Sequence, residues 1–178
     1  MDEKKVFPAK IQIHQGRDAA ARAIQFSPAT GEVSEEKDRK FILNVACCSK
    51  QLPGGSNKFD WSKAVNFGMN LSEVLVFFAA VKSLCTSDTC KDGKQSFVHG
   101  SKSLNVEKGT DGKSIKIGFY DKVNGNGSVM VGVGDANYYA LLYILEYTIM
   151  KAPSIMAWGE SFMVRPTVID MFSKKEEK

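Results

Sequence analysis

The stretch that decides the fold runs from Phe59 to Leu84 and reads FDWSKAVNFGMNLSEVLVFFAAVKSL. Its first part alternates with a period of two, which is the pattern of a half-buried β-strand because successive side chains point to opposite faces. The residues on one side of this alternation are Trp61, Lys63, Val65, Phe67 and Met69.

At Ser72 the period changes to that of a helix. The Ser72 hydroxyl can accept a bond from an unpaired N–H of the first turn, and Glu73 suits the positive end of a helix. Every residue from Val74 to Val81 is apolar, and the first polar residue after them is Lys82. A helix that is apolar all round must be covered all round, so a second subunit is the natural cover.

A second helix is predicted from Asp135, as its cap, to Met150, with Pro153 helping to terminate it. It too is apolar or aromatic on nearly every face, although Glu146 interrupts it. Both apolar runs are shorter than the roughly 20 residues that a bilayer crossing needs. We therefore expect buried core helices, no membrane partner, and a folded protein that is not a stable monomer.

The rest of the chain alternates in short segments separated by turn residues, among them Thr110-Asp111-Gly112. The order is four strands, a helix, four strands and a helix, which predicts an α+β fold with two four-stranded antiparallel sheets, each followed by a helix. Besides the strand in the opening stretch, the expected strands are Lys10–His14, Ala21–Ser27, Arg39–Ser49, Gln95–His99, Lys102–Lys108, Ser114–Val123 and Ser128–Val133.

The four cysteines match no metal-site signature. Adjacent Cys47 and Cys48 would point to opposite faces of a strand, and Cys85 and Cys90 lack the spacing of a zinc knuckle. We expect no metal and no cofactor. No local motif brings a base beside a nucleophile, so we expect no catalytic residues and no enzyme.

The chain of 178 residues carries a net charge of +4, and the distribution of this charge is uneven. Acidic residues gather in the expected termini and loops, whereas basic residues occupy the expected strands. Lysines two apart on a sheet face, with an aromatic between them, can follow a phosphate backbone. The candidate nucleic-acid-binding residues are Lys10, Gln12, His14, Arg22, Lys40, Lys63, Lys102, Lys116, Tyr120 and Lys122.

The strand alternation sorts these candidates into groups. Lys10, Gln12 and His14 are expected on one outward face, opposite Ile11 and Ile13. Lys116, Tyr120 and Lys122 are expected on another outward face, and the inward side of the same strand carries Ile115, Ile117 and Phe119. Arg22 and Lys63 share their sides with apolar residues, which indicates positions at a sheet margin.

Three segments resemble plant Whirly single-stranded-DNA-binding proteins: FDWSK at 59–63 with LSEV at 71–74, KSLNV at 102–106 followed by Asp111-Gly112, and APSIMAW at 152–158. Their order and spacing agree over most of Lys10 to Trp158. The second strand differs, because residues 18–24 read DAAARAI where plant Whirly proteins carry KGKAAL. The chain looks closer to the kinetoplastid mitochondrial RNA-binding proteins, a Whirly-fold pair.

This resemblance implies a Whirly-type fold whose helices form the core of a heterotetramer with a homologous Whirly-fold subunit. It implies binding of single-stranded RNA (guide RNA and mRNA), promotion of RNA annealing in mitochondrial RNA editing, and a mitochondrial location. The implied domains are a flexible segment at 1–9, a Whirly-type nucleic-acid-binding domain at 10–159 and a tail at 160–178. Single-stranded DNA binding in transcription or genome maintenance is the alternative, and a protein-interaction scaffold is an alternative of another class.

Overall fold

The computed structural model describes residues 10–16, 21–29, 41–49, 58–86, 90–123 and 129–155. The first half forms an antiparallel sheet of four strands in the order β1-β2-β3-β4, followed by helix α1. A short 3₁₀-helix, η2 (Trp61–Lys63), leads into β4. The elements of this half are β1 (Ile11–Gln15), β2 (Arg22–Pro28), β3 (Leu43–Cys48), β4 (Val65–Met69) and α1 (Leu71–Lys82).

The second half repeats this plan with a sheet in the order β5-β6-β7-β8, followed by helix α2. Its elements are β5 (Lys94–His99), β6 (Lys102–Lys108), β7 (Ile115–Asp121), β8 (Val129–Val133) and α2 (Asp135–Ile155). The predicted α+β architecture is therefore confirmed. Lys40, the N-terminal segment and the C-terminal tail lie outside the described residues.

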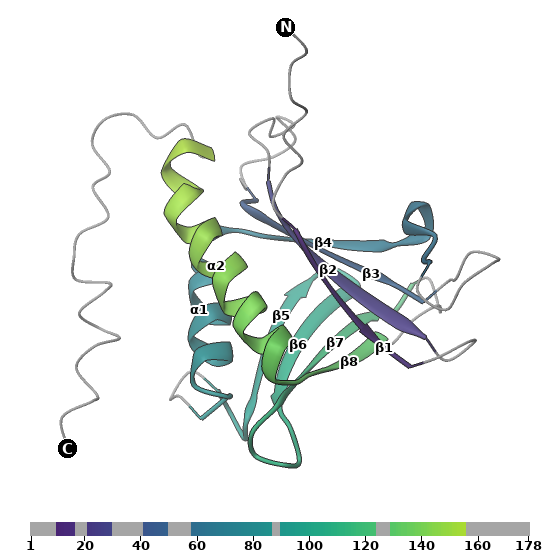
Figure 1. Cartoon of the computed structure of the whole chain (residues 1–178). Coiled ribbons are helices and arrows are strands. Elements are labelled where there is room, and N and C mark those ends of the chain that lie inside the picture. Colours follow the sequence, from purple (N-terminus) through teal and green to yellow (C-terminus); the bar gives the residue numbers. More distant parts are fainter. Residues whose placement is uncertain are drawn as a thin grey trace, which may run out of the picture.

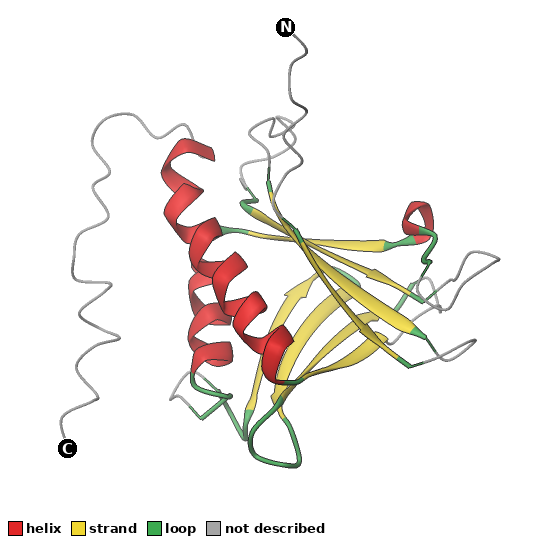
Figure 2. Ribbon diagram, in the orientation of Figure 1, coloured by secondary structure: helices red, strands yellow, loops and turns green. Residues whose placement is uncertain are grey.

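The two halves interlock. The sheets meet where β8 packs against β1 and β2, and the helices lie side by side (Figure 1; Figure 2). α1, which follows the first sheet, packs mainly against β5 and β6 of the second. α2, which follows the second sheet, packs mainly against β1 and β2 of the first. One core therefore serves both halves.

Period-two alternation sends one face of each sheet into this core. In the first sheet the pairing of neighbouring strands aligns Ile11, Phe26, Val45 and Phe67 in a single row. In the second sheet Leu104 lies opposite Phe119 and both are fully buried, as are Val106 and Ile117 in the next row. We call these the inner faces, and the opposite faces the outer faces.

Part of the outer face of the first sheet is also covered. Cys48 is buried there with Phe59, Ala21 and Ala23, and Trp61 of η2 packs against this cluster. Cys47 belongs to the main core instead. The prediction that the adjacent cysteines point to opposite faces is confirmed.

The cap of α1 differs from the prediction. Asn70, and not Ser72, is the N-cap: its side-chain oxygen accepts a hydrogen bond from the Glu73 N–H at 3.0 Å, and the Glu73 carboxylate accepts one from the Asn70 N–H at 2.9 Å. The reason is that β4 ends at Met69, so the chain turns one residue later and the helix already begins at Leu71. Ser72 is an exposed residue of the first turn.

The single chain covers α1 more fully than the sequence predicts. Every residue from Val74 to Val81 is buried or half-buried, because α2 and the second sheet supply the cover expected from a second subunit. α2 is different, since it exposes a stripe of large side chains. Tyr139 is 70% exposed, Tyr143 is 67% exposed and Met150 is 80% exposed.

Both predicted ends of the second helix need correction. The Gly134 carbonyl accepts a hydrogen bond from the Tyr138 N–H at 2.9 Å, so Gly134 occupies the cap position and Asp135 is the first helical residue. The helix also continues two residues past Pro153, to Ile155. A proline this close to the end removes one hydrogen bond without stopping the last turn. No helix in the described ranges is long and apolar enough to cross a membrane.

Candidate nucleic-acid interface

The outer face of the second sheet carries the best-defined group of predicted residues. Lys116 and Tyr120 of β7 alternate with the buried Ile115, Ile117 and Phe119, and both are half-buried on the outer face. Lys122 follows in the turn after β7, where its backbone N–H donates to the Ser101 carbonyl at 3.0 Å and its side chain is exposed. The predicted alternation of this segment is confirmed.

Lys116 stands in a charged row that the sequence analysis missed. Strand pairing aligns it with Glu107 and Lys94 across the outer face, and the Lys94 ammonium lies 2.9 Å from the Glu107 carboxylate. Glu107 therefore lies beside Lys116, and its carboxylate forms an ion pair with Lys94. The period-two alternation of Lys94, Ser96 and Val98 could have indicated that Lys94 lies on the outer face. Glu107 could be placed beside Lys116 only from the strand register.

The same row continues into the first sheet. Gly132 of β8 lies opposite Lys116, and its N–H donates to the Gln15 side-chain carbonyl at 2.5 Å. A Cβ at Gly132 would lie 3.6 Å from the nearest Gln15 atom, so the Gln15 amide rests directly over the glycine. Through this contact the end of β1 lies against β8, on the side of β1 opposite to His14.

β1 carries the second group of predicted residues. Lys10, immediately before the strand, and His14 are exposed, while Gln12 between them is half-buried. Ile13 is fully buried on the opposite side, so the predicted alternation is confirmed. The His14 ring lies 5.4 Å from the Phe59 ring, centroid to centroid, which holds the imidazole at the surface beside the η2 cluster.

Lys102 lies apart from both groups. It begins β6 on the same side as Leu104, and its ammonium donates to the backbone carbonyl of Asn66 on β4 at 3.1 Å. It therefore links the two sheets at the margin of the inner faces, and it does not share the outer face of Lys116. This contact joins residues far apart in the chain, which the local pattern around Lys102 does not encode.

Arg22 and Lys63 are the remaining predicted residues. Arg22 begins β2 on the side of Ile24, as predicted, and its guanidinium donates to the Ala21 carbonyl at 2.8 Å. Lys63 is exposed at the end of η2. The structure thus places Lys116 in one row with Glu107 and Lys94 and sets β1 beside β8, the edge strand of that sheet, whereas Arg22 and Lys102 lie on the inner sides of their strands.

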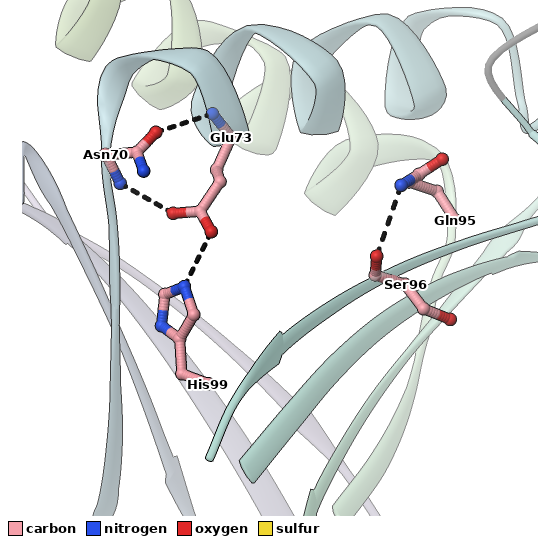
Figure 3. A network of polar contacts seen from close by, with 5 residues as sticks. All are labelled: Asn70, Glu73, Gln95, Ser96 and His99. Carbon is pink, nitrogen blue, oxygen red and sulfur yellow. Dashed lines mark hydrogen bonds and ion pairs between the residues drawn. The ribbon is translucent and has the colours of Figure 1, made fainter.

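A polar network connects the sheets near the start of α1 (Figure 3). The His99 Nε2 atom at the end of β5 lies 2.6 Å from the Glu73 carboxylate, which also serves the cap at Asn70. The His99 ring stacks on Phe67 with the centroids 4.3 Å apart and the planes at 5°. His99 therefore has a structural role, holding β5 against β4 and α1.

Three of the four cysteines, Cys47, Cys48 and Cys85, are buried. Burial raises the pKa of the Cys85 thiol to about 12, with Cys90 as the next largest influence, and burial also raises the pKa of Cys47. Such thiols stay protonated at neutral pH. Within the described part of the chain no three His, Cys, Asp or Glu side chains cluster where they could hold a metal ion.

Two four-stranded antiparallel sheets, each followed by a helix, define the Whirly-type α+β fold. Solved structures with this fold match nearly the whole chain. The plant transcriptional regulator PBF-2 matches at 18% identity with a TM-score of 0.55, over 95% of this chain and 90% of that one. WHY1 from Arabidopsis thaliana matches at 19% identity with a TM-score of 0.54, over 88% of this chain and 95% of that one.

A guide-RNA-binding protein complex bound to a guide RNA also has this fold. It matches at 10% identity with a TM-score of 0.57, over 82% of this chain and 92% of that one. No protein-family model matches the chain, and no curated protein matches it. At these identities the comparisons establish the fold, and the function has to be argued from the chain's own surface.

Proposed function

We propose that this protein binds single-stranded RNA on the outer surface formed by β7 and β1, and that it acts as a guide-RNA-binding protein. The observation that carries the proposal is the contact between the two sheets: the row of Lys94, Glu107 and Lys116 ends at Gly132, whose N–H donates to Gln15 of β1. The strand that carries the second basic group therefore lies beside β8, the edge of the sheet that carries the first. The guide-RNA-bound complex with the same fold supports this choice of ligand.

The chemistry of such a surface is electrostatic. Lys116 and Lys122 on one side and Lys10 and His14 on the other would contact phosphates, releasing counterions from the strand. Neutralising the phosphates of two strands lowers their mutual repulsion and so promotes annealing. Phosphate contacts fix position and carry little sequence information, so binding along this surface should tolerate many sequences. No step of this function is a chemical reaction.

The proposal includes a partner subunit. The exposed stripe of α2 is formed by Tyr139, Tyr143 and Met150, with Glu146 between them, at spacings of three and four residues. Such spacing is typical of a helix face that packs against another helix. We propose that a homologous Whirly-fold subunit covers this stripe in a heterotetramer. We further propose that this heterotetramer acts in mitochondrial RNA editing. The trypanosome MRP1/MRP2 structures, at 14% identity, support a paired arrangement.

The test is titration of a labelled guide-like RNA at several salt concentrations, wild type against Lys116→Ala/Lys122→Ala. For single strands the log–log salt slope is about 0.7 per neutralised phosphate, so the double variant should flatten the slope by roughly one to two units and weaken binding to all strands alike. The matched control is Lys82→Ala/Lys108→Ala, which removes the same charge from exposed positions off the proposed surface.

Unchanged affinity and slope in the Lys116/Lys122 variant, with native circular dichroism, would refute this surface as the binding site. Competition between RNA and DNA strands of matched sequence separates the proposal from the alternative, single-stranded DNA binding. That alternative is favoured by the fold shared with the transcriptional regulator PBF-2. A protein-interaction scaffold would bind neither strand.

A further inference from the structure

Part of the outer face of the first sheet is polar and uncharged, unlike that of the second. Strand pairing sets two neighbouring rows on it. The first row is Gln12, Gln25, Ala46 and Asn66, and the second is Ser27, Asn44 and Gly68. Every residue of both rows is neutral. On the outer face of the second sheet, by contrast, one row contains the charged residues Lys94, Glu107 and Lys116.

The amides of these rows form a ladder. Gln12 Nε2 donates to Gln25 Oε1 at 2.6 Å, and Gln25 Nε2 donates to Ser27 Oγ at 3.1 Å. Asn44 Nδ2 donates to Asn66 Oδ1 at 3.1 Å. A side-chain amide has two N–H donors and a carbonyl oxygen with two lone pairs. Each of these bonds therefore uses only part of the hydrogen-bonding capacity of the amide. The ladder orients the amides and leaves donors and acceptors for another molecule.

An aromatic ring adjoins the ladder. Phe41 is 38% exposed, and its ring lies so close to the Gly68 backbone that a Cβ there would come within 2.6 Å of it. Only a glycine leaves room for this contact. Gly68 lies opposite Asn44, and Asn66 is two residues away on the same face of β4, a separation of roughly 7 Å. We call Phe41, Asn44, Asn66, Gln12 and Gln25 the amide face.

We infer that the amide face binds the unpaired bases of the strand whose phosphates are held by the lysine surface, that is, by Lys10, His14, Lys116 and Lys122. This inference rests on the proposed function. Neutral donors and acceptors match the edges of nucleobases, which single strands leave open, whereas phosphates call for charge. Phe41 provides a surface on which a base stacks, and Asn44 and Asn66 bond to base edges.

The position of β1 connects the two surfaces. Lys10 and His14 share the outer side of β1 with Gln12, which begins the first amide row. A phosphate held by Lys10 or His14 therefore sets the attached base over the ladder. Stacking and amide bonds involve no ion release, so this contribution to affinity is independent of salt. The lysine surface and the amide face are thus separable by experiment.

The experiment compares a short labelled RNA with a strand of equal length that carries abasic sites, and so has the same phosphates. Wild type should bind the base-bearing strand more tightly. Phe41→Leu keeps an apolar cover on Gly68 but removes the ring, and it should lower this preference by about tenfold, the scale of base–aromatic stacking. Asn44→Ala/Asn66→Ala removes both partners of one hydrogen bond and should lower the preference for the base-bearing strand several-fold.

Neither variant should change affinity for the abasic strand or the salt slope. Ser96→Ala, at an exposed outer position of the second sheet, is the matched control and should leave the preference intact. If wild type binds neither strand, the proposed function fails and this inference with it. If wild type prefers the base-bearing strand but both folded variants keep the full preference, the amide face is not the base site and only this inference is overturned.

Discussion

The two sheet-and-helix halves follow the same plan but expose different surfaces. In the first half part of the outer sheet face is the uncharged amide ladder, and every residue of the apolar run of α1 is buried or half-buried. In the second half the outer sheet face carries lysines, and α2 exposes Tyr139, Tyr143 and Met150. Repetition of a plan therefore does not imply repetition of a role.

The crossed packing explains the difference between the helices. α1 lies against β5 and β6 with α2 beside it, so it is enclosed by the other half and its neighbour. α2 rests on β1 and β2 with one side and meets α1 with another, which leaves its remaining face without cover from this chain. Two helices of similar apolarity thus differ in burial because of their positions in the fold.

The largest expected effect concerns this exposed face. Tyr139→Glu/Tyr143→Glu adds two charges to the stripe, which a packed interface cannot solvate, so association with a partner subunit or with a second copy should be abolished. Sedimentation velocity at micromolar concentration measures this, with circular dichroism to verify the fold. Asn137→Glu, at an exposed position outside the stripe, should leave association intact. Unchanged sedimentation of the double variant would exclude the stripe as the interface.

The second prediction tests whether the two halves share one core. Phe67 of the first sheet is buried, stacks on His99 and meets Phe119 of the second sheet edge-on with the centroids 6.3 Å apart. Phe67→Ala should lower the free energy of unfolding by about 3–5 kcal/mol, and Phe119→Ala by a similar amount. Urea denaturation should show one transition in each variant.

The control for this comparison is Val98→Ala, since Val98 is 66% exposed and its loss should change the free energy of unfolding by less than about 0.5 kcal/mol. A separate transition for each half would contradict the shared core.

The third prediction distinguishes the two caps proposed for α1. Asn70→Ala removes the acceptor of the Glu73 N–H and should cost about 1 kcal/mol of unfolding free energy. Ser72→Ala, at the cap expected from sequence, should cost less than about 0.5 kcal/mol because Ser72 is an exposed first-turn residue. Urea midpoints measure both. A larger loss from Ser72→Ala would reinstate the predicted cap.

The smallest effect is expected at the turn before β7. The Asp111 carboxylate accepts hydrogen bonds from the Ser114 hydroxyl and from the backbone N–H groups of Lys113 and Ser114, which lower its pKa below the usual 3.8. A lowered folded-state pKa stabilises the fold above pH 3.8, and this stabilisation is lost as the pH falls through the folded value. The urea midpoint of Asp111→Ala should therefore lie slightly below that of wild type at pH 7, and the gap should narrow at pH 3. A gap that widens on acidification would refute this sign.

Local pattern predicted most of the fold but only part of the candidate site. The alternation around Ile115–Phe119 and around Ile13 correctly separated inner from outer residues, because the pleat of a strand imposes the period of two on any partner. The same reasoning could not foresee that Lys102 would bond the Asn66 carbonyl. Nor could it foresee that Glu107 would stand between Lys94 and Lys116.

By itself the sequence determined the order of strands and helices, the side of each strand that faces the core, and the apolar character of both helices, since these depend on neighbours within a few residues. Only the tertiary structure decided which helix is covered, which lysines share a face, and that Phe41 and four amides from four separate segments form one surface. The physical reason is strand register and crossed packing. Both join residues that are distant in the chain, and no local period records which distant segment will become a neighbour.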